Sequence, residues 1–179
     1  MKIIKPLILA SLVGILAYLV LTQRGKSFAR FIGGSIMNIS QTGIDLIAGR
    51  EGFSEKPYND PPGSQKWSIG YGHQILPGEN LTYVTRDQAL TLLAKDTAKA
   101  EYAVRRNITV VLTQSQHDAL VSFVYNVGIG AFEKGSVPTK INAGNFAAAA
   151  NSIRAYNKAG GVVNMALVAR RESEAVTFA

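Results

Sequence analysis

An uncharged apolar run near the amino terminus constrains this chain more than any other feature of its sequence. Residues 6–23 read PLILASLVGILAYLVLTQ and contain no Asp, Glu, Lys or Arg. As an α-helix, a run of about 18 residues is about 27 Å long, which is close to the roughly 30 Å hydrocarbon core of a bilayer. A helix on the surface of a soluble domain would show a polar stripe, and none is visible here. We therefore expect residues 6–23 to lie in a membrane rather than in a protein core.

Three kinds of membrane segment fit this run: a permanent anchor, a cleaved signal peptide, and a weak signal anchor that can leave the membrane. Lys2 and Lys5 suit the basic start of a signal peptide, and residues 27–29 offer small residues for cleavage. However, Arg24 and Lys26 stand between that site and the apolar run. Several small or polar residues weaken insertion and make exit conceivable: Ser11, Gly14, Ala17, Thr22 and Gln23. We favour an uncleaved anchor, with the rest of the chain outside the cytoplasmic membrane.

The remaining sequence predicts one folded domain of the α+β class. We expect an anchor over residues 1–24, a linker over 25–38 and a domain over 39–179. Within residues 56–75, a turn at residues 60–63 precedes Trp67, Ile69 and Tyr71, which alternate with small residues and predict a small antiparallel hairpin or three-stranded sheet. Helices are expected near residues 41–50, 137–142, 146–156 and 164–178. Two more are expected to begin at capping boxes: one from residues 85–88 to about 105, the other from residues 113–116 to residues 126–130.

Charge and composition exclude several classes of function. The net charge is +7, but the first thirty residues hold five basic residues and no acidic one, whereas the rest of the chain is nearly balanced. These basic residues therefore flank the apolar run and suit lipid headgroups or membrane topology rather than a nucleic-acid face. With no cysteine, the chain can form no disulfide, thiolate metal site or cysteine nucleophile. We expect a monomer that needs no metal and no cofactor and binds no nucleic acid.

Two carboxylates, Glu51 and Asp60, are the residues best suited to chemistry. Glu51 follows an apolar helix face beside Phe53, whereas Asp60 stands in a polar turn next to prolines. An acid catalyst must keep its proton near neutral pH and needs apolar or partly buried surroundings, whereas a base must stay ionised and needs water or hydrogen-bond donors. The surroundings of Glu51 and Asp60 differ in that direction, so the two groups can divide acid and base work.

Several motifs surround these carboxylates and continue along the chain. They are Glu51-Gly52-Phe53, Pro57-Tyr58-Asn59-Asp60 with Gly63, Ser68-Ile69-Gly70-Tyr71-Gly72-His73, and the segments 122–128, 159–161 and 167–172. In this order they resemble the phage-type lysozymes, a family of glycoside hydrolases, over roughly residues 39–178. The resemblance implies a lysozyme-like fold.

The resemblance also implies hydrolysis of the β-1,4 bond between N-acetylmuramic acid and N-acetylglucosamine in the glycan strands of peptidoglycan. It assigns Glu51 as the general acid and Asp60 as the base that positions water, with Ser68 in the place of a threonine that helps to hold this water. Candidate sugar contacts are Tyr58, Tyr71 and Asn126. Room for the water in an inverting enzyme predicts about 6.5–9.5 Å between the two carboxyl groups.

The chain departs from the family pattern around Ser68. Serine replaces the family's threonine, and seven residues separate it from Asp60, more than is common in the family. We therefore expect a longer hairpin that bulges at residues 61–63. The family also implies that His73 is structural and pairs with an acid. Arg170 and Arg171, next to Glu172, are expected to tie the last helix to the domain.

Two other functions stay open at this point. A lytic transglycosylase would use Glu51 as acid and then base and form a 1,6-anhydro product without water. A catalytically inactive, membrane-anchored wall-binding or virion protein would be consistent with the altered spacing before Ser68.

Residues 6–23 resemble the anchors that hold some members of this family, the signal-anchor endolysins, inactive on the membrane. We therefore expect the host inner membrane and then the periplasm as the location, with a virion membrane as the alternative. Because the chain has no cysteine, activation would be topological rather than by thiol exchange.

Overall fold

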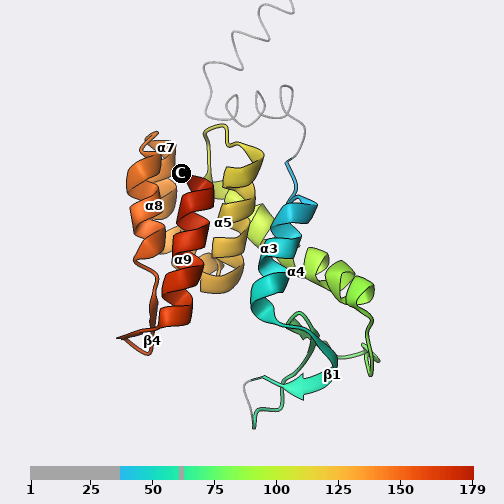
Figure 1. Ribbon diagram of the computed structural model, residues 1–179. Helices are drawn as coiled ribbons and strands as arrows, with labels where there is room; N and C mark the ends of the chain where they lie inside the picture. The colour runs from blue at the N-terminus through green and yellow to red at the C-terminus, as the bar shows by residue number, and fades with distance from the viewer. Residues whose placement is uncertain (1–36, 61–62) are drawn as a thin grey trace, which may run out of the picture. The chain divides into compact units, whose positions relative to one another are not determined.

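The computed structural model describes residues 37–60 and 63–179, and residues 38–179 form one compact unit. In chain order its elements are α3 (Gln41–Glu51), β1 (Ser54–Asn59), β2 (Trp67–Gly70), β3 (His73–Gln74), α4 (Arg86–Asn107), α5 (Gln114–Val127), α6 (Ile129–Lys134), α7 (Val137–Asn142), α8 (Phe146–Arg154), β4 (Lys158–Ala159), β5 (Val162–Val163) and α9 (Met165–Phe178). Figure 1 shows α5, α8 and α9 grouped together, with β1 beyond the end of α3. The expected α+β class is confirmed.

The predicted membrane helix over residues 6–23 lies outside the described residues, as does nearly all of the predicted linker. Within residues 37–60 and 63–179, no helix combines the length and the apolar character needed to cross a bilayer.

The sheet that follows α3 is antiparallel, with β2 between β1 and β3. Across β1 and β2, Tyr58 pairs with Ser68 and Asn59 pairs with Trp67. Directly paired residues of an antiparallel sheet share a face, and successive residues alternate between faces. Tyr58 and Ser68 therefore lie on one face of the sheet, and Asn59 and Trp67 lie on the other. The three-stranded alternative is the one that forms.

The strand β2 ends at Gly70, so Tyr71 lies in the following turn and not on the strand as predicted. Gly70 has a positive φ of 68°, a conformation that favours glycine. A Cβ atom at this position would lie 2.8 Å from the Cβ atom of Ala89 in α4. Both constraints explain why glycine ends the strand where the sheet packs on α4.

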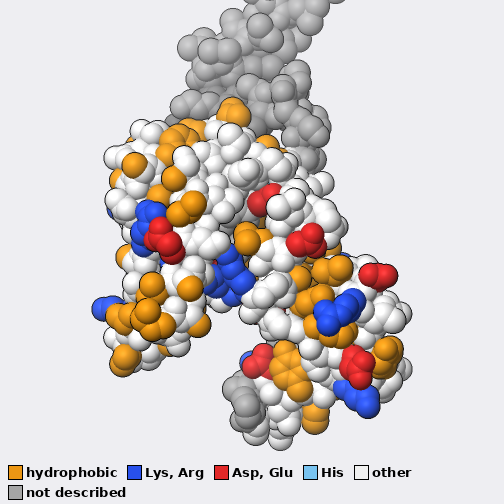
Figure 2. Space-filling model, viewed as in Figure 1, with side chains coloured by type: hydrophobic (Ala, Val, Ile, Leu, Met, Phe, Trp, Pro, Cys, Tyr) orange, Lys and Arg blue, Asp and Glu red, His pale blue; other side chains and the backbone are white. Residues whose placement is uncertain are grey.

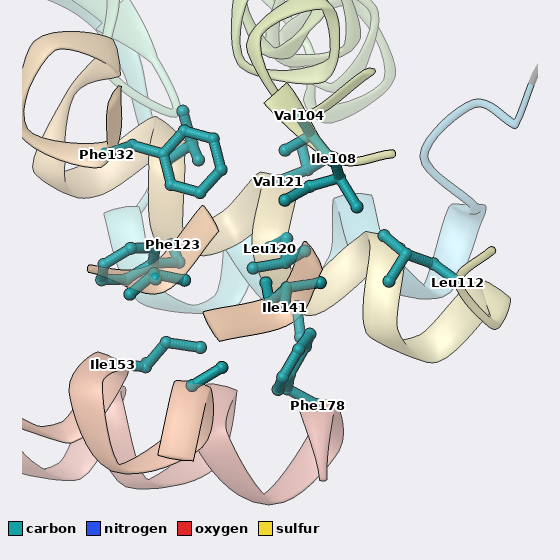
Figure 3. Close-up of a cluster of buried hydrophobic side chains, with 14 of the residues drawn as sticks. Val104, Ile108, Leu112, Leu120, Val121, Phe123, Phe132, Ile141, Ile153 and Phe178 are labelled. Atoms are coloured by element: carbon teal, nitrogen blue, oxygen red, sulfur yellow. The ribbon is translucent and has the colours of Figure 1, made fainter. Parts of the chain in front are cut away.

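The helical body is built around α5, which begins at one of the two predicted capping boxes. The Thr113 hydroxyl accepts a hydrogen bond from the Gln116 backbone N–H, and the Gln116 side chain accepts one from the Thr113 N–H. Thr85 and Gln88 form the same motif at the start of α4, as expected. Figure 3 shows part of the apolar core that α5 shares with its neighbours, including Val104, Ile108, Leu112, Leu120, Val121, Phe123, Phe132, Ile141, Ile153 and Phe178. Burying each large apolar side chain contributes about 1.5–3 kcal/mol.

A second, smaller apolar cluster joins α3, the sheet and the first half of α4. Its central members are Ile44, Ile47, Ile69 and Leu93. The long helix α4 belongs to both clusters, because its second half contributes Ala100, Ala103 and Val104 to the core of the body. The sheet and the helical body are thus connected through one continuous helix and through the packing of α3 on α5.

One short helix and one hairpin were not predicted. The chain was expected to leave the helical state at residues 126–130; instead Gly128, at a positive φ of 86°, ends α5 and the short helix α6 follows. Phe132 anchors this helix, because its side chain is fully buried. At Gly160 and Gly161, which were expected only to separate helices, two residues of positive φ turn β4 back on β5. Paired positive φ values are typical of tight hairpin turns.

Candidate active site

Glu51 is the last residue of α3, and an arginine from the other end of the chain holds its carboxylate. The helix begins at Ser40, whose hydroxyl accepts a hydrogen bond from the Gly43 N–H, and ends before Gly52. Arg170 Nη1 of α9 donates to Glu51 Oε1 at 2.7 Å. The Glu51 side chain is 24% exposed and the Arg170 side chain 9%, so the ion pair is partly screened from water.

Arg170 is itself fixed by a buried carboxylate one helical turn away. Its Nε donates to Glu174 Oε1 at 3.2 Å, and the Glu174 side chain is fully buried. The same oxygen accepts hydrogen bonds from the Ser122 hydroxyl at 2.8 Å and from Arg50 Nη1 at 3.3 Å. Such a buried carboxylate needs compensating charge and hydrogen bonds, and these three donors supply them.

Arg170 and Arg171 tie the last helix to the domain as expected, through Glu51 and Asn126. The partners themselves were not predicted, and Glu172 pairs instead with Arg154 at the surface. The available signal was helical spacing: Glu174 precedes the buried Phe178 by one turn, so it faces the core and requires a cationic partner.

Asp60 follows directly after β1 and is exposed to water. Its N–H donates to the Lys66 carbonyl at 3.1 Å, which continues the pairing of the two strands by one residue. Asp60 thus lies one residue beyond Asn59, at the turn end of the paired strands β1 and β2. The two residues after it, 61–62, where the longer hairpin was expected to bulge, lie outside the described part of the chain.

The hydroxyl of Tyr58 senses both candidate carboxylates. Partial burial raises the pKa of Tyr58, and the negative charges of Asp60 and then Glu51 raise it further. The pKa of Tyr125, at the end of α5, is also raised, first by burial and then by the charges of Asp96 and Glu51. The charges of both carboxylates therefore raise the pKa of the same phenol, on β1.

The other predicted site residues differ in their surroundings. Ser68 is 4% exposed and lies opposite Tyr58 across the strands. Tyr71 is buried against Phe53, with 5.4 Å between the ring centroids, so little of its surface is free for a sugar. Asn126 is exposed at the end of α5, where its side-chain oxygen accepts a hydrogen bond from Arg171 Nη2.

His73 is buried and has an acid on each side of its ring. Nδ1 lies 2.9 Å from Asp96 Oδ2, and Nε2 lies 3.0 Å from Glu79 Oε2. Burial alone would lower the pKa of His73, but the hydrogen bonds and charges of the two acids outweigh it and raise the pKa. The pairing with an acid agrees with the structural role that the family resemblance implied.

Figure 2 shows a hollow in the surface between the side that carries β4 and the side that carries β1. Basic side chains lie at the inner end of this hollow. Among the residues that the structure describes, no group of three or more His, Cys, Asp or Glu side chains is arranged to hold a metal ion. The candidate site offers two carboxylates, of which Glu51 is ion-paired and partly buried and Asp60 is exposed to water.

Comparisons with known proteins identify relatives of this chain. The chain is 43% identical over 142 residues to the endolysin of Bacillus phage B103, covering 79% of this chain but 54% of the relative, so it spans about half the length of the first curated relatives it matches. It is 35% identical over 155 residues to the SAR-endolysin of Enterobacteria phage P21, covering 83% of this chain and 91% of that one.

Solved structures of similar proteins extend the likeness to the fold. A P22 lysozyme variant matches with a TM-score of 0.73 and 32% identity, over 79% of this chain and 98% of that one. The muramidase domain of SpmX from Asticaccaulis excentricus matches with a TM-score of 0.71 and 34% identity, over 79% of this chain and 97% of that one. The expected lysozyme-like fold is thus confirmed. Since the family model for phage lysozyme also matches residues 48–174, which include both carboxylates, the chain belongs to the phage lysozyme family.

Proposed function

We propose that this chain is a muramidase that hydrolyses the β-1,4 bond between N-acetylmuramic acid and N-acetylglucosamine in peptidoglycan, in the lysis of a bacterial cell wall. One observation carries the proposal: Glu51, partly buried and ion-paired at the end of α3, and Asp60, exposed to water directly after β1, lie at the ends of two consecutive elements of the chain. Membership of the phage lysozyme family supports the same pair as the reacting groups.

In the proposed reaction, Glu51 gives its proton to the glycosidic oxygen as the bond from that oxygen to the sugar C1 breaks. A water molecule attacks C1 from the opposite face, and Asp60 accepts the proton that this water loses. Both bonding electrons of the broken bond leave with the protonated oxygen, so the products are two sugars with free hydroxyl groups. Because water must fit beside the second carboxylate, we expect a separation of about 6.5–9.5 Å between the carboxyl groups and inversion at C1.

Arg170 has a positioning role in this proposal. Arg170 Nη1 donates to Glu51 Oε1 and so holds the carboxyl group in place at the end of α3. Glu174 holds Arg170 through its Nε atom and so limits how far the guanidinium can move.

The remaining predicted residues take supporting roles. Ser68 lies on the Tyr58 face of the sheet and is proposed to help Asp60 hold the water. Tyr58 and Asn126 are proposed to contact the sugars. Tyr71 contributes more through its packing on Phe53 than through direct contact, since it is buried.

We also propose that residues 6–23 form a signal anchor that holds the enzyme at the host inner membrane before it acts in the periplasm. The relatives named as SAR-endolysins support this, as does the uncharged sequence of the segment. Membrane and soluble fractions collected before and after an uncoupler test the release. Movement of the protein into the soluble fraction is expected, whereas permanent retention in the membrane would contradict release.

The catalytic proposal is tested by comparing Glu51→Gln with Glu55→Gln in the full-length protein, purified in a mild detergent. Glu55 is an exposed acid on β1 in the same hairpin, which makes it a matched control. We expect Glu51→Gln to lose at least about a hundredfold in the rate of peptidoglycan clearing, because an amide cannot donate the proton, and Glu55→Gln to stay close to wild type. Equal rates for the two variants would refute the role of Glu51.

A further inference from the structure

A second hollow lies beside the candidate active site but is not part of it. It has a volume of about 540 Å³, within the range of about 300–1,000 Å³ that is usual for small-ligand pockets. Its apolar lining includes Trp67, Pro57 and Ile75, and its polar lining includes Gln65, Lys66 and Gln74. We call it the Trp67 hollow.

The Trp67 hollow includes neither candidate carboxylate, and Trp67 lies on the face of the sheet opposite Ser68, whereas Gln74 pairs with Ser68 and shares its face. Trp67 and Ser68 are neighbours in β2, so their side chains point to opposite faces of the sheet. Their burial agrees with this, since Trp67 is 48% exposed and Ser68 is 4% exposed. Neither Glu51 nor Asp60 lines the hollow.

The indole of Trp67, 48% exposed at the wall of a hollow, offers a flat aromatic face to a ligand. The pyranose ring of a sugar suits this face, because its C–H bonds carry partial positive charge and can lie against the negative face of the indole. The amides of Gln65 and Gln74 both donate and accept hydrogen bonds, as hydroxyl and acetamido groups require. Lys66 adds one cation, which suits the carboxylates that decorate peptidoglycan.

Other ligand classes fit this lining less well. A phosphate or nucleotide site would be expected to gather several cations or a helix N-terminus, and Lys66 is the one cationic residue of this lining. A lipid surface would be disfavoured by the two amides, which would lose their hydrogen bonds to water. This lining combines one aromatic face, apolar walls and neutral amides, and that combination suits a saccharide.

We propose that the Trp67 hollow is an accessory saccharide site that binds N-acetylhexosamine units of the glycan strand outside the bond-cleaving cleft. The inference rests on the proposed function, since it assumes that the substrate is peptidoglycan. A second contact with the same polymer raises the effective concentration of strand at the cleft without any change in the chemistry. The site therefore strengthens binding to long, insoluble strands and leaves turnover of short fragments unaltered.

The test uses the full-length protein and exploits the single tryptophan of the chain. Because Trp67 is that tryptophan, tryptophan fluorescence reports changes around this residue. Titration with tri-N-acetylglucosamine is expected to give a saturable change in emission, and Gln65→Ala is expected to weaken this binding about tenfold, the equivalent of about 1.4 kcal/mol. An emission unaffected by the trisaccharide, or equal affinities for wild type and Gln65→Ala, would overturn the proposal.

A sedimentation assay with purified insoluble peptidoglycan provides the second measurement. Trp67→Ala is made in a Glu51→Gln background, so that the polymer is not digested, and Tyr102→Ala serves as the control because Tyr102 is another exposed aromatic residue, on α4. We expect about tenfold weaker binding for Trp67→Ala than for Tyr102→Ala, with similar thermal unfolding of both. In the active protein, Trp67→Ala should raise KM on the polymer and leave kcat on short soluble fragments unchanged.

These outcomes separate the two proposals. If Glu51→Gln retains full hydrolysis, the proposed catalytic function fails, whatever the binding assays give. If hydrolysis requires Glu51 but Trp67→Ala and Tyr102→Ala bind peptidoglycan equally, only the accessory site fails. Should Trp67→Ala not fold, Gln65→Ala and Gln74→Ala test the same lining in both assays, and unchanged binding by both would overturn the proposal.

Discussion

Glu51 and Asp60 stand nine residues apart in the chain, but different parts of the molecule hold them. Glu51 depends on Arg170, which lies 119 residues further along and is itself held by the buried Glu174. Asp60 depends on its own hairpin, through a backbone hydrogen bond to Lys66. The carboxylate at the helix end is therefore tied to the packing of the helical body, whereas the carboxylate of the hairpin is tied to local strand pairing.

Because of this difference, substitutions around Glu51 and around Asp60 should reduce activity in different ways. A change in the network below Glu51 should reduce stability and activity together, because Arg170 bridges Glu51 to the core of the body. A change at Asp60 should reduce activity alone, because its side chain is exposed. Substitutions in the two regions should therefore differ in their effect on stability.

Glu174→Gln is expected to have the largest effect. Removal of this buried charge leaves Arg170 and Arg50 without their common acceptor charge, and breaking a buried ion pair costs about 3–5 kcal/mol. Urea unfolding followed by circular dichroism measures the loss. The control is Glu172→Gln, since Glu172 pairs with Arg154 at the surface and its loss should change stability little. Equal stability of the two variants would break the proposed link between Glu51 and the body.

Asp60→Asn is expected to come next, as a loss of activity without a loss of stability. An amide cannot accept the proton of the attacking water, so the rate of peptidoglycan clearing should fall about a hundredfold or more. Asp87→Asn, on the exposed first turn of α4, is the matched control. A shift in the urea midpoint of Asp60→Asn similar to that of Glu174→Gln would contradict the independence of the two regions.

Asp96→Asn tests the sheet side of the molecule through His73. Loss of a hydrogen bond to a charged group costs about 1.5–3 kcal/mol, and Glu79→Gln should cost less because Glu79 is more exposed. Since the folded state raises the pKa of His73 above its ordinary value of about 6.5, the pairing stabilises fully below that value and is lost as pH rises through the folded pKa.

The pH dependence of the Tm therefore distinguishes this pair from general damage. The Tm difference between wild type and Asp96→Asn should shrink as pH rises from about 6 to about 9. His117 contributes the opposite slope, because burial lowers its pKa, but it does so in both proteins and cancels in the difference. A Tm difference that is constant across this range would show that His73 is not the group responsible.

Thr113→Ala should have the smallest effect. It removes one side of the capping box at the start of α5 and is expected to cost about 1 kcal/mol. Thr85→Ala removes the same motif from α4, so the two variants form a natural pair for thermal unfolding. If either variant lost as much stability as Glu174→Gln, the capping boxes would contribute far more to the stability of the fold than expected.

The same division explains what the sequence could predict. The two capping boxes and most helix positions, including the bounds of α7, could be predicted from neighbouring residues. Asp60 was likewise chosen as a candidate from the turn residues around it. The partner of Glu51 could not be found in this way, because Arg170 approaches it only through tertiary packing. The helix α6 was missed for the same reason: Gly128 reads as a terminator, and only the buried Phe132 keeps the next turn helical.

The most direct test of the central claim is the fate of water in the products. Purified peptidoglycan is digested by the full-length protein in water labelled with heavy oxygen, and the fragments are analysed by mass spectrometry. We expect one labelled oxygen on each new N-acetylmuramic acid reducing end, with the inverted anomer seen first by proton NMR. Unlabelled 1,6-anhydro ends would contradict hydrolysis by Glu51 and Asp60 and would indicate a transglycosylase instead.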